Sequence, residues 1–138
     1  MMRPNDIALL ILRLTTAVVI WPHGAQKALG IFGGYGIAGT VAGLSHMGIP
    51  VVLAYLVIAA EFLAPFALVF GVLTRLAALG IGIDMAVAAY RVHLPNGFFM
   101  NFAGNQKGEG IEFFIFAVGI CLALVIAGSG RIALLPKT

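Results

Sequence analysis

Four long apolar segments, separated by short polar or glycine-rich stretches, dominate the pattern of hydrophobic and polar positions along the chain. Each segment has close to the ~20 residues that a helix needs to cross a hydrocarbon core of about 30 Å. The pattern therefore predicts an all-α fold: an integral membrane four-helix bundle that forms a single transmembrane domain over residues 1–138. The predicted spans are residues 7–24, 51–72, 76–94 and 111–128.

The connections add two expectations. In the glycine-rich first connection, Ile37, Val41 and Leu44 recur at helical spacing, which predicts a short helix lying in the membrane interface. The second connection, residues 71–75, is so short that the second and third spans must be antiparallel neighbours.

The first span carries a polar stripe that lipid would not tolerate. At 100° per residue its members fall within an arc of about 80° on one side of the helix. An arginine at the middle of a membrane costs about 2.5–3.5 kcal/mol on insertion scales, so the stripe should face the protein interior. The stripe consists of Arg13, Thr16, Ile20, His23 and Lys27.

The composition agrees with a membrane protein. Hydrophobic residues make up 62% of the chain and charged residues 9%, against about 45–50% and about 25% in soluble domains. The net charge of +3 is scattered along the chain, so no nucleic-acid partner is predicted. The single cysteine, Cys121, offers neither a disulfide framework nor a CxxC redox pair.

Three ionisable residues are predicted to share one level near the bilayer centre. Arg13, Glu61 and Asp84 each lie about 15–16 Å from the outer end of their predicted helix. They are either an ion-pair clamp that fixes helix register or a proton- or ligand-binding centre. Because one arginine faces two carboxylates, we expect one carboxyl to be protonated near neutral pH, which favours the binding centre. Pro65 removes the helical donor of the Glu61 carbonyl, which is compatible with a site and with an ordinary bend.

A second group of polar residues is expected at the outer end of the bundle. For Lys27 and Glu109 taken singly, ordinary snorkelling to the interface is the preferred interpretation. The two histidines with a carboxylate have ligand chemistry, but no local metal-binding spacing, so no metal site is predicted. The group consists of His23, Lys27, Arg91, His93, Glu109 and Glu112.

The distribution of basic residues predicts the orientation. Four Lys or Arg residues fall on the side of both termini and three on the other side, so both termini are expected in the cytoplasm.

Several motifs resemble those of the DoxX family, from about Ile7 to Arg131. They are LILRLTTAVVIWPHGAQKALG, GGYGIAGTVAGLSHMGIP, the hairpin AAEFLAPFALVFGVLTRLAAL, HLPNGFF and GEGIE. The resemblance implies a small four-helix protein of the plasma (inner) membrane of bacteria or archaea. Some relatives are membrane subunits of thiosulfate:quinone oxidoreductase, and others are linked to oxidative, thiol or quinone stress. The residues matching the family's recurrent polar positions are Arg13, His23, Lys27, Glu61 and His93, with Glu112 a weaker match.

The leading hypothesis is a quinone-linked subunit of a membrane redox complex, with quinone or another small apolar ligand entering near His23 and His93. Arg13, Glu61 and Asp84 would handle protons or orient a carbonyl, and no catalytic residue is assigned. With a lone cysteine, any thiol chemistry would need a redox partner subunit. Two alternatives stay open: a proton-coupled small-molecule transporter, working as a homodimer, and a non-catalytic scaffold of a redox complex.

Overall fold

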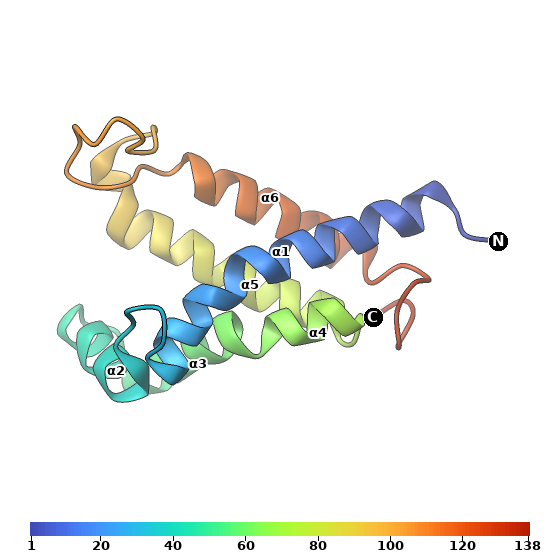
Figure 1. Ribbon diagram of the computed structural model, residues 1–138, viewed down its shortest axis with the longest axis horizontal. Coiled ribbons are helices and arrows are strands. Elements are labelled where there is room, and N and C mark those ends of the chain that lie inside the picture. The colour runs from blue at the N-terminus through green and yellow to red at the C-terminus, as the bar shows by residue number, and fades with distance from the viewer.

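The computed structural model describes all residues from 1 to 138, and they form helices without any strand. The all-α prediction is therefore confirmed. In chain order (Figure 1) the helices are α1 (Pro4–Leu29), α2 (Gly36–His46), α3 (Val51–Phe62), α4 (Ala64–Phe70), α5 (Thr74–Ala88), a π-helical turn (Ala89–His93), a 3-10 turn (Leu94–Asn96) and α6 (Glu112–Ala127).

Helix α1 is longer at both ends than the predicted span 7–24. It starts with Pro4, whose missing N–H costs nothing in a first turn. The Asp6 carboxylate accepts the backbone N–H of Arg3 at 3.0 Å, which caps this start. The helix continues through Pro22 and ends at Leu29. The next residue, Gly30, takes the left-handed conformation (φ 71°) that glycine adopts without strain. Its 26 residues therefore place Arg13 off centre.

The predicted second span is interrupted at Leu63, between α3 and α4. Pro65 has no N–H to donate to the carbonyl of Glu61, four residues earlier, so the regular ladder stops there. The two helices still form one apolar segment of 20 residues, long enough to cross a membrane.

Three segments are long and apolar enough to cross a membrane: Pro4–Leu29, Val51–Phe70 and Thr74–Asn96. Helix α6 is apolar but has only 16 residues, fewer than the predicted span 111–128. Helix α2 forms where the short helix of the first connection was predicted. Its place in the membrane interface stays a prediction.

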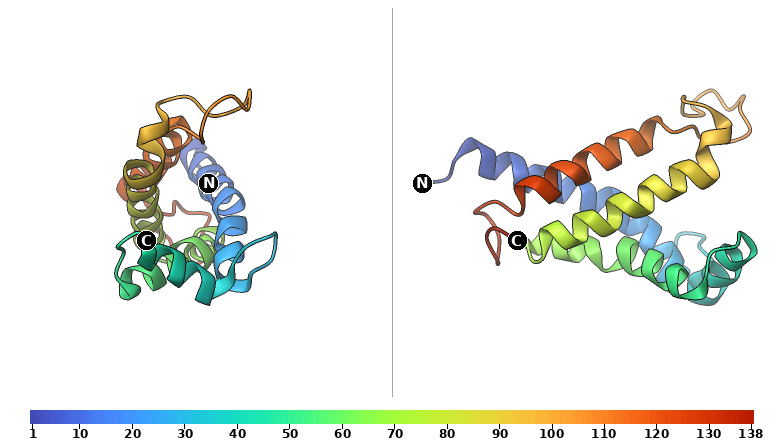
Figure 2. Two further views of the ribbon diagram at one scale, coloured as in Figure 1. Left: turned by 90° about the vertical axis from the view of Figure 1, so that its left-hand side faces the viewer. Right: turned by 180° about the vertical axis from the view of Figure 1, so that it is seen from behind.

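Both termini lie at one end of the molecule, called here the tail end (Figure 1). The opposite end, the loop end, carries α2 and the connection between the 3-10 turn and α6. Helix α1 packs along α3 and α4, whereas α5 packs along α4 and most closely along α6. Viewed from the loop end, α2 lies across the ends of α1 and α3 (Figure 2).

The core is small and lies where these helices meet. Ala17, Ile20, Leu68, Ile81 and Leu124 are buried in it. Many large apolar side chains instead point outward from the spanning helices, and a soluble monomer rarely exposes so much apolar surface. Such a surface suits a lipid environment. Among the exposed residues are Val18, Leu56, Ile83, Phe116 and Ile126.

The chain after α6 folds back against the turn between α4 and α5. The backbone N–H groups of Leu134 and Leu135 donate to the carbonyls of Phe70 and Gly71, at 2.9 and 3.2 Å. We call residues 128–138 the tail segment. Its backbone bonds hold it as an ordered cover over the tail end.

Candidate functional site

Arg13 does not meet Glu61 or Asp84. Its guanidinium donates from Nη1 to the Ser129 carbonyl at 2.8 Å and from Nη2 to the Ile132 carbonyl at 2.7 Å, both in the tail segment. The side chain is only 1% exposed. The predicted grouping of Arg13 with Glu61 and Asp84 is therefore wrong, because Arg13 is not the cation beside these carboxyls. The predicted depth of Arg13 assumes a helix that ends at Gly24, whereas α1 runs from Pro4 to Leu29 and places Arg13 nearer the tail end.

Lys27 supplies the cation instead. Its Nζ lies 2.5 Å from Glu61 Oε2, the only salt bridge in the structure. Side chains of a helix tilt toward its N-terminus, so a lysine in the last turn of α1 reaches back toward the middle of the bundle. The Lys27 side chain is 28% exposed and that of Glu61 only 6%. The ion pair thus joins a partly accessible ammonium to a buried carboxylate.

Asp84 completes the group from α5. Its carboxyl lies close enough to the Glu61 carboxyl and to Lys27 to interact with their charges. Asp84 Oδ2 is buried and receives no hydrogen bond. Two ionised carboxylates cannot donate to each other, whereas a single proton between them would supply the missing bond and neutralise the group. We call Lys27, Glu61 and Asp84 the Lys27 cluster.

A glycine and a proline build this cluster locally. A Cβ atom on Gly24 would lie 2.0 Å from the Glu61 carbonyl oxygen, so α1 and α3 touch through their backbones at this level. The same carbonyl is the one that Pro65 leaves without a helical donor. Gly24 thus brings the helix of Lys27 against the interrupted helix of Glu61.

Three aromatic rings flank this interruption. Trp21 lies 6.2 Å from Phe62 and 6.1 Å from Phe66, and the two phenylalanine rings are 6.0 Å apart between centroids. Their role was not predicted, although the spacing of Phe62 and Phe66, four residues apart in the sequence, was the available signal. They pack α1 against α3 and α4 beside the cluster.

No hydrogen bond or ion pair joins either histidine to the Lys27 cluster. His23 is exposed on α1. His93 Nδ1 lies 2.9 Å from the Glu109 carbonyl, and its ring centroid lies 4.4 Å from that of Phe114. No three His, Cys, Asp or Glu side chains are grouped as metal ligands. A shared entrance formed by His23 and His93 stays a prediction.

Arg91 and Glu112 bind loop backbone. Arg91 Nη2 donates to the Met47 carbonyl at 2.6 Å, which joins the π-helical turn after α5 to the C-terminal end of α2. The Glu112 carboxylate accepts the backbone N–H of Met100 at 3.0 Å. Both residues stabilise the loop end, away from the cluster.

Asp6 is a structural residue that the sequence reasoning missed. Besides capping α1, its Oδ1 accepts the backbone N–H of Arg131 at 3.0 Å. This bond joins residues 125 positions apart, so no local pattern could reveal it. Asp6 and Arg13 together anchor the tail segment to α1.

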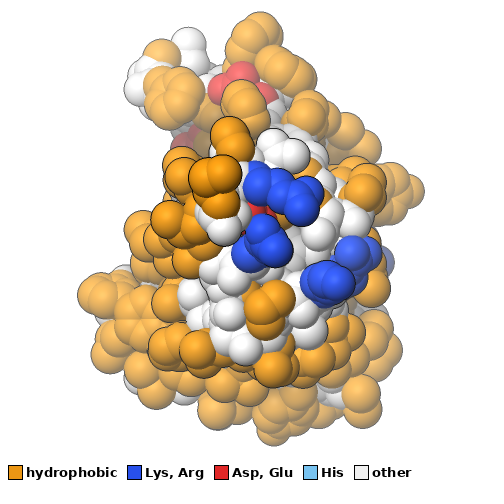
Figure 3. Space-filling model, turned by 90° about the vertical axis from the view of Figure 1, so that its right-hand side faces the viewer, with side chains coloured by type: hydrophobic (Ala, Val, Ile, Leu, Met, Phe, Trp, Pro, Cys, Tyr) orange, Lys and Arg blue, Asp and Glu red, His pale blue; other side chains and the backbone are white.

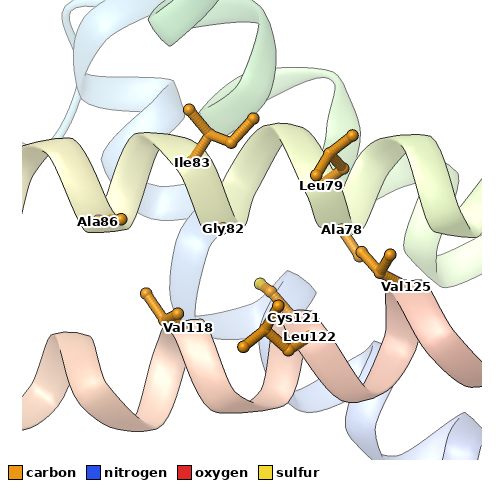
Figure 4. Close-up of a pocket in the computed structure, with 9 residues that line it drawn as sticks. All are labelled: Ala78, Leu79, Gly82, Ile83, Ala86, Val118, Cys121, Leu122 and Val125. Atoms are coloured by element: carbon orange, nitrogen blue, oxygen red, sulfur yellow. The ribbon is translucent and has the colours of Figure 1, made fainter.

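An apolar groove lies between α5 and α6. Its narrower part exposes the small residues Ala78, Gly82 and Ala86 of α5 opposite Cys121 of α6 (Figure 4). Its wider part, a cavity of about 520 Å³, lies toward the loop end and includes Tyr90 and Phe114. At 100° per residue, Gly82 and Ala86 lie about 160° around α5 from Asp84, so this helix separates the groove from the Lys27 cluster.

Comparisons with known proteins match this arrangement to one family. Residues 8–94, well over half of the chain, match the family model described as DoxX. The chain is 35% identical over 74 residues to a protein of Haemophilus influenzae named "Uncharacterized protein", covering 54% of this chain and 45% of that protein. It thus spans less than half the length of this relative.

A second relative covers nearly the whole chain. The protein of Bacillus subtilis named "Putative oxidoreductase CatD" is 28% identical over 131 residues, which are 95% of this chain and 87% of that protein. No solved structure matches the chain significantly. The match over residues 8–94 and the apolar helices together establish that this membrane protein belongs to the DoxX family.

Proposed function

We propose that this protein is the membrane-embedded subunit of a quinone-linked redox system, in which the Lys27 cluster binds and releases protons. One observation carries the proposal: Asp84 Oδ2 is buried without a donor beside the Glu61 carboxyl, and one lysine faces the two carboxyls. Ionisable groups inside a membrane protein are expensive and mark proton or ligand sites. A shared proton satisfies both carboxyls, and its uptake or loss is the chemistry that this arrangement supports.

Quinone chemistry needs such a proton site. Reduction of a quinone to a quinol consumes electrons and protons in equal number, and oxidation releases them. The chain carries no motif for a flavin, haem or iron–sulfur cluster, so electrons would come from a partner subunit. This chain would supply the apolar binding site for the quinone and the protons for its reduction.

The groove between α5 and α6 suits an apolar ring or alkyl chain. Its wider part has a volume in the range of small-molecule sites and is lined almost entirely by apolar side chains. His93 stacks against Phe114, which lines this cavity, so the head group of a quinone would lie near His93 rather than near His23. Asp84 faces the other side of α5, so its carboxyl would serve as a proton store and not as a direct ligand.

In the proposed arrangement α1, α3 with α4, α5 and α6 cross the plasma membrane as a four-helix bundle. Helix α2, which runs across the loop end, lies in the interface. Basic side chains gather on the face of the tail end (Figure 3), and the positive-inside rule then assigns both termini to the cytoplasm. The basic residues of this end are Arg3, Arg75, Arg131 and Lys137.

Purification from native membranes tests the proposal. We expect a quinone, identified by mass spectrometry of the extracted lipids, to accompany the protein. Gly119→Leu should displace it, because Gly119 lines the groove and has open space where the side chain would go. Gly43→Leu in α2, which is equally open, is the matched control. Absence of quinone together with unchanged tolerance of a deletion strain to quinones and oxidants would refute the proposal.

The Lys27 cluster also fits two other functions. In a proton-coupled transporter, working as a homodimer, pH gradients would drive solute flux in reconstituted vesicles. In a non-catalytic scaffold, the combined replacement Lys27→Met, Glu61→Gln and Asp84→Asn would leave the assembly and activity of the redox complex intact. Loss of activity with intact assembly favours the redox subunit.

A further inference from the structure

We infer that the Lys27 cluster exchanges protons with the loop end alone, and that an apolar layer and the buried charge of Arg13 close it toward the tail end. This inference rests on the proton-binding role proposed above. It adds a direction to that role, because it names the side of the membrane from which the protons come.

Polar atoms connect the cluster with the loop end. Lys27 lies in the last turn of α1, and its side chain is partly exposed there. Its Nζ contacts Glu61 Oε2 directly, and the Asp84 carboxyl lies next to Glu61. The Lys27 ammonium can give one of its protons to Glu61 and then take up another from the loop end, which connects that end with the two adjacent carboxyls.

No such connection leads to the tail end. Between the level of Gly24 and that of Arg13, about 16 Å apart along α1, the interior is filled by buried apolar side chains of three helices. Thr16 is the one buried polar residue of α1 in this interval, and its hydroxyl donates to the Leu12 carbonyl of its own helix at 2.7 Å. The other buried polar side-chain atom of α1 in this interval is Trp21 Nε1, which has no hydrogen-bond partner. An indole N–H only donates, so it cannot accept a proton and pass it on. The layer consists of Ala17, Ile20, Leu68 and Ile81.

Arg13 adds an electrostatic barrier behind this layer. Its guanidinium is bonded to two tail-segment carbonyls and to no carboxylate, so its positive charge is not neutralised by an ion pair. Gly71 allows the close approach: a Cβ atom there would lie 2.4 Å from Arg13 Nη1. A fixed positive charge in a narrow, poorly hydrated passage repels protons, as in channels that exclude them.

Among the other titratable groups on the helices around the cluster, His23 of α1, His46 of α2 and Tyr55 of α3 are exposed. Helix α4 contains none. In α6, Glu112 accepts the N–H of Met100 and Cys121 packs against Gly82. Arg91, in the π-helical turn after α5, is exposed and bonded to Met47. The protonation of the cluster therefore depends on Lys27, Glu61 and Asp84 and on the side to which they open.

One-sided access has a functional consequence. A proton that enters and leaves at the same end supplies or removes hydrogen ions for a redox step, but it does not cross the membrane. A transporter would need the same carboxyls to open to both ends. The side of access thus separates the redox proposal from the transport alternative.

The test is infrared spectroscopy of oriented proteoliposomes. The orientation of the protein in the vesicles is determined by labelling the variant Thr138→Cys with a membrane-impermeant thiol reagent. The natural cysteine, Cys121, is buried and does not compete for the label. The protonated-carboxyl band is identified by its loss in Glu61→Gln or Asp84→Asn. We expect the intensity of this band to change when the pH at the loop end is varied and the pH at the tail end is held constant. The intensity should stay unchanged when only the pH at the tail end is varied.

The outcomes are distinguishable. A band that follows the pH of the tail end, or of both ends, overturns the one-sided access while leaving the proton site and the quinone proposal in place. A protein without any such band at either pH overturns both this inference and the proton-binding role. Quinone co-purification is measured separately and depends on neither result.

Discussion

Lys27 and Arg13 carry the same charge on the same helix but have different partners. About 21 Å of helix separates them. Lys27, near the loop end, neutralises a buried carboxylate, whereas Arg13 is surrounded by carbonyl oxygens of the tail segment. The difference follows from the chemistry of the two side chains: the planar fork of arginine fits two carbonyls at once, and the flexible lysine stem reaches back to one carboxylate.

Removing Lys27 tests the charge count of the cluster. In Lys27→Met the two carboxyls lose their only cation, so we expect both to be protonated and the infrared intensity of protonated carboxyl to rise. Leaving buried charge unpaired costs about 3–5 kcal/mol, and protonation should keep the loss of stability at or below the low end of that range.

Arg91→Met is the control for the Lys27 replacement. It removes an equal charge from an exposed side chain that binds the Met47 carbonyl. It should leave the carboxyl band unchanged. An unchanged band in Lys27→Met as well would show that Lys27 does not neutralise the carboxyls.

At the scale of the elements, the contact between α1 and α3 determines the site. Gly24 permits direct backbone contact with Glu61, and the break at Leu63 lies just beyond that contact. The helices carrying Lys27 and Glu61 meet closely because one has no side chain at this point. Helix packing in membranes commonly depends on such small residues.

Gly24→Ala should therefore disturb the cluster more than its single added methyl suggests. The new Cβ would clash with the Glu61 backbone, which cannot move aside as a side chain can. We expect a loss of about 1–3 kcal/mol, measured by thermal unfolding in detergent, with a weakened protonated-carboxyl band.

Gly43→Ala in α2 is the matched control, since nothing lies within 4 Å of its added Cβ. Helix propensity predicts a gain of up to about 1 kcal/mol there. Equal stability of the two variants would argue against a close α1–α3 contact at Gly24.

At the scale of the whole molecule, the tail segment joins the two ends of the chain. Asp6 and Arg13 of α1 bind its backbone, and it pairs in turn with Phe70 and Gly71 at the turn before α5. The tail end is consequently closed, while the loop end keeps the partly exposed Lys27. The molecule is asymmetric along its long axis.

Arg13→Met should release this cover. The carbonyls of Ser129 and Ile132 would lose their donors, at a cost of about 1–3 kcal/mol for each buried group left unsatisfied. We expect faster proteolysis and faster hydrogen exchange in residues 128–138. Arg131→Met is the control, because the Arg131 side chain bonds only the exposed Met1 carbonyl and its backbone bond to Asp6 remains. Equal protection of the tail segment in both variants would refute the anchoring role of Arg13.

Much of the fold was available from the sequence because it depends on local patterns. Apolar length predicted the helices, and the spacing of Ile37, Val41 and Leu44 predicted α2. Pro65 indicated a bend in the second span, which the structure shows as an interruption at Leu63. The sequence also identified Glu61 and Asp84 as buried carboxyls with too few cations. These properties follow from the hydrophobic effect and from backbone hydrogen bonding, which act along each helix separately.

The tertiary structure alone decided which cation meets those carboxyls. The predicted first span ends at Gly24, five residues before the observed end of α1 at Leu29. Because each residue changes the depth by about 1.5 Å, this difference made Arg13 instead of Lys27 the expected cation beside the carboxyls. Arg13 instead binds backbone carbonyls of the tail segment. No sequence pattern predicts this partner, because every residue has a carbonyl group. The sequence by itself determined that charge must be neutralised inside the membrane, and only helix packing determined where and by which residue.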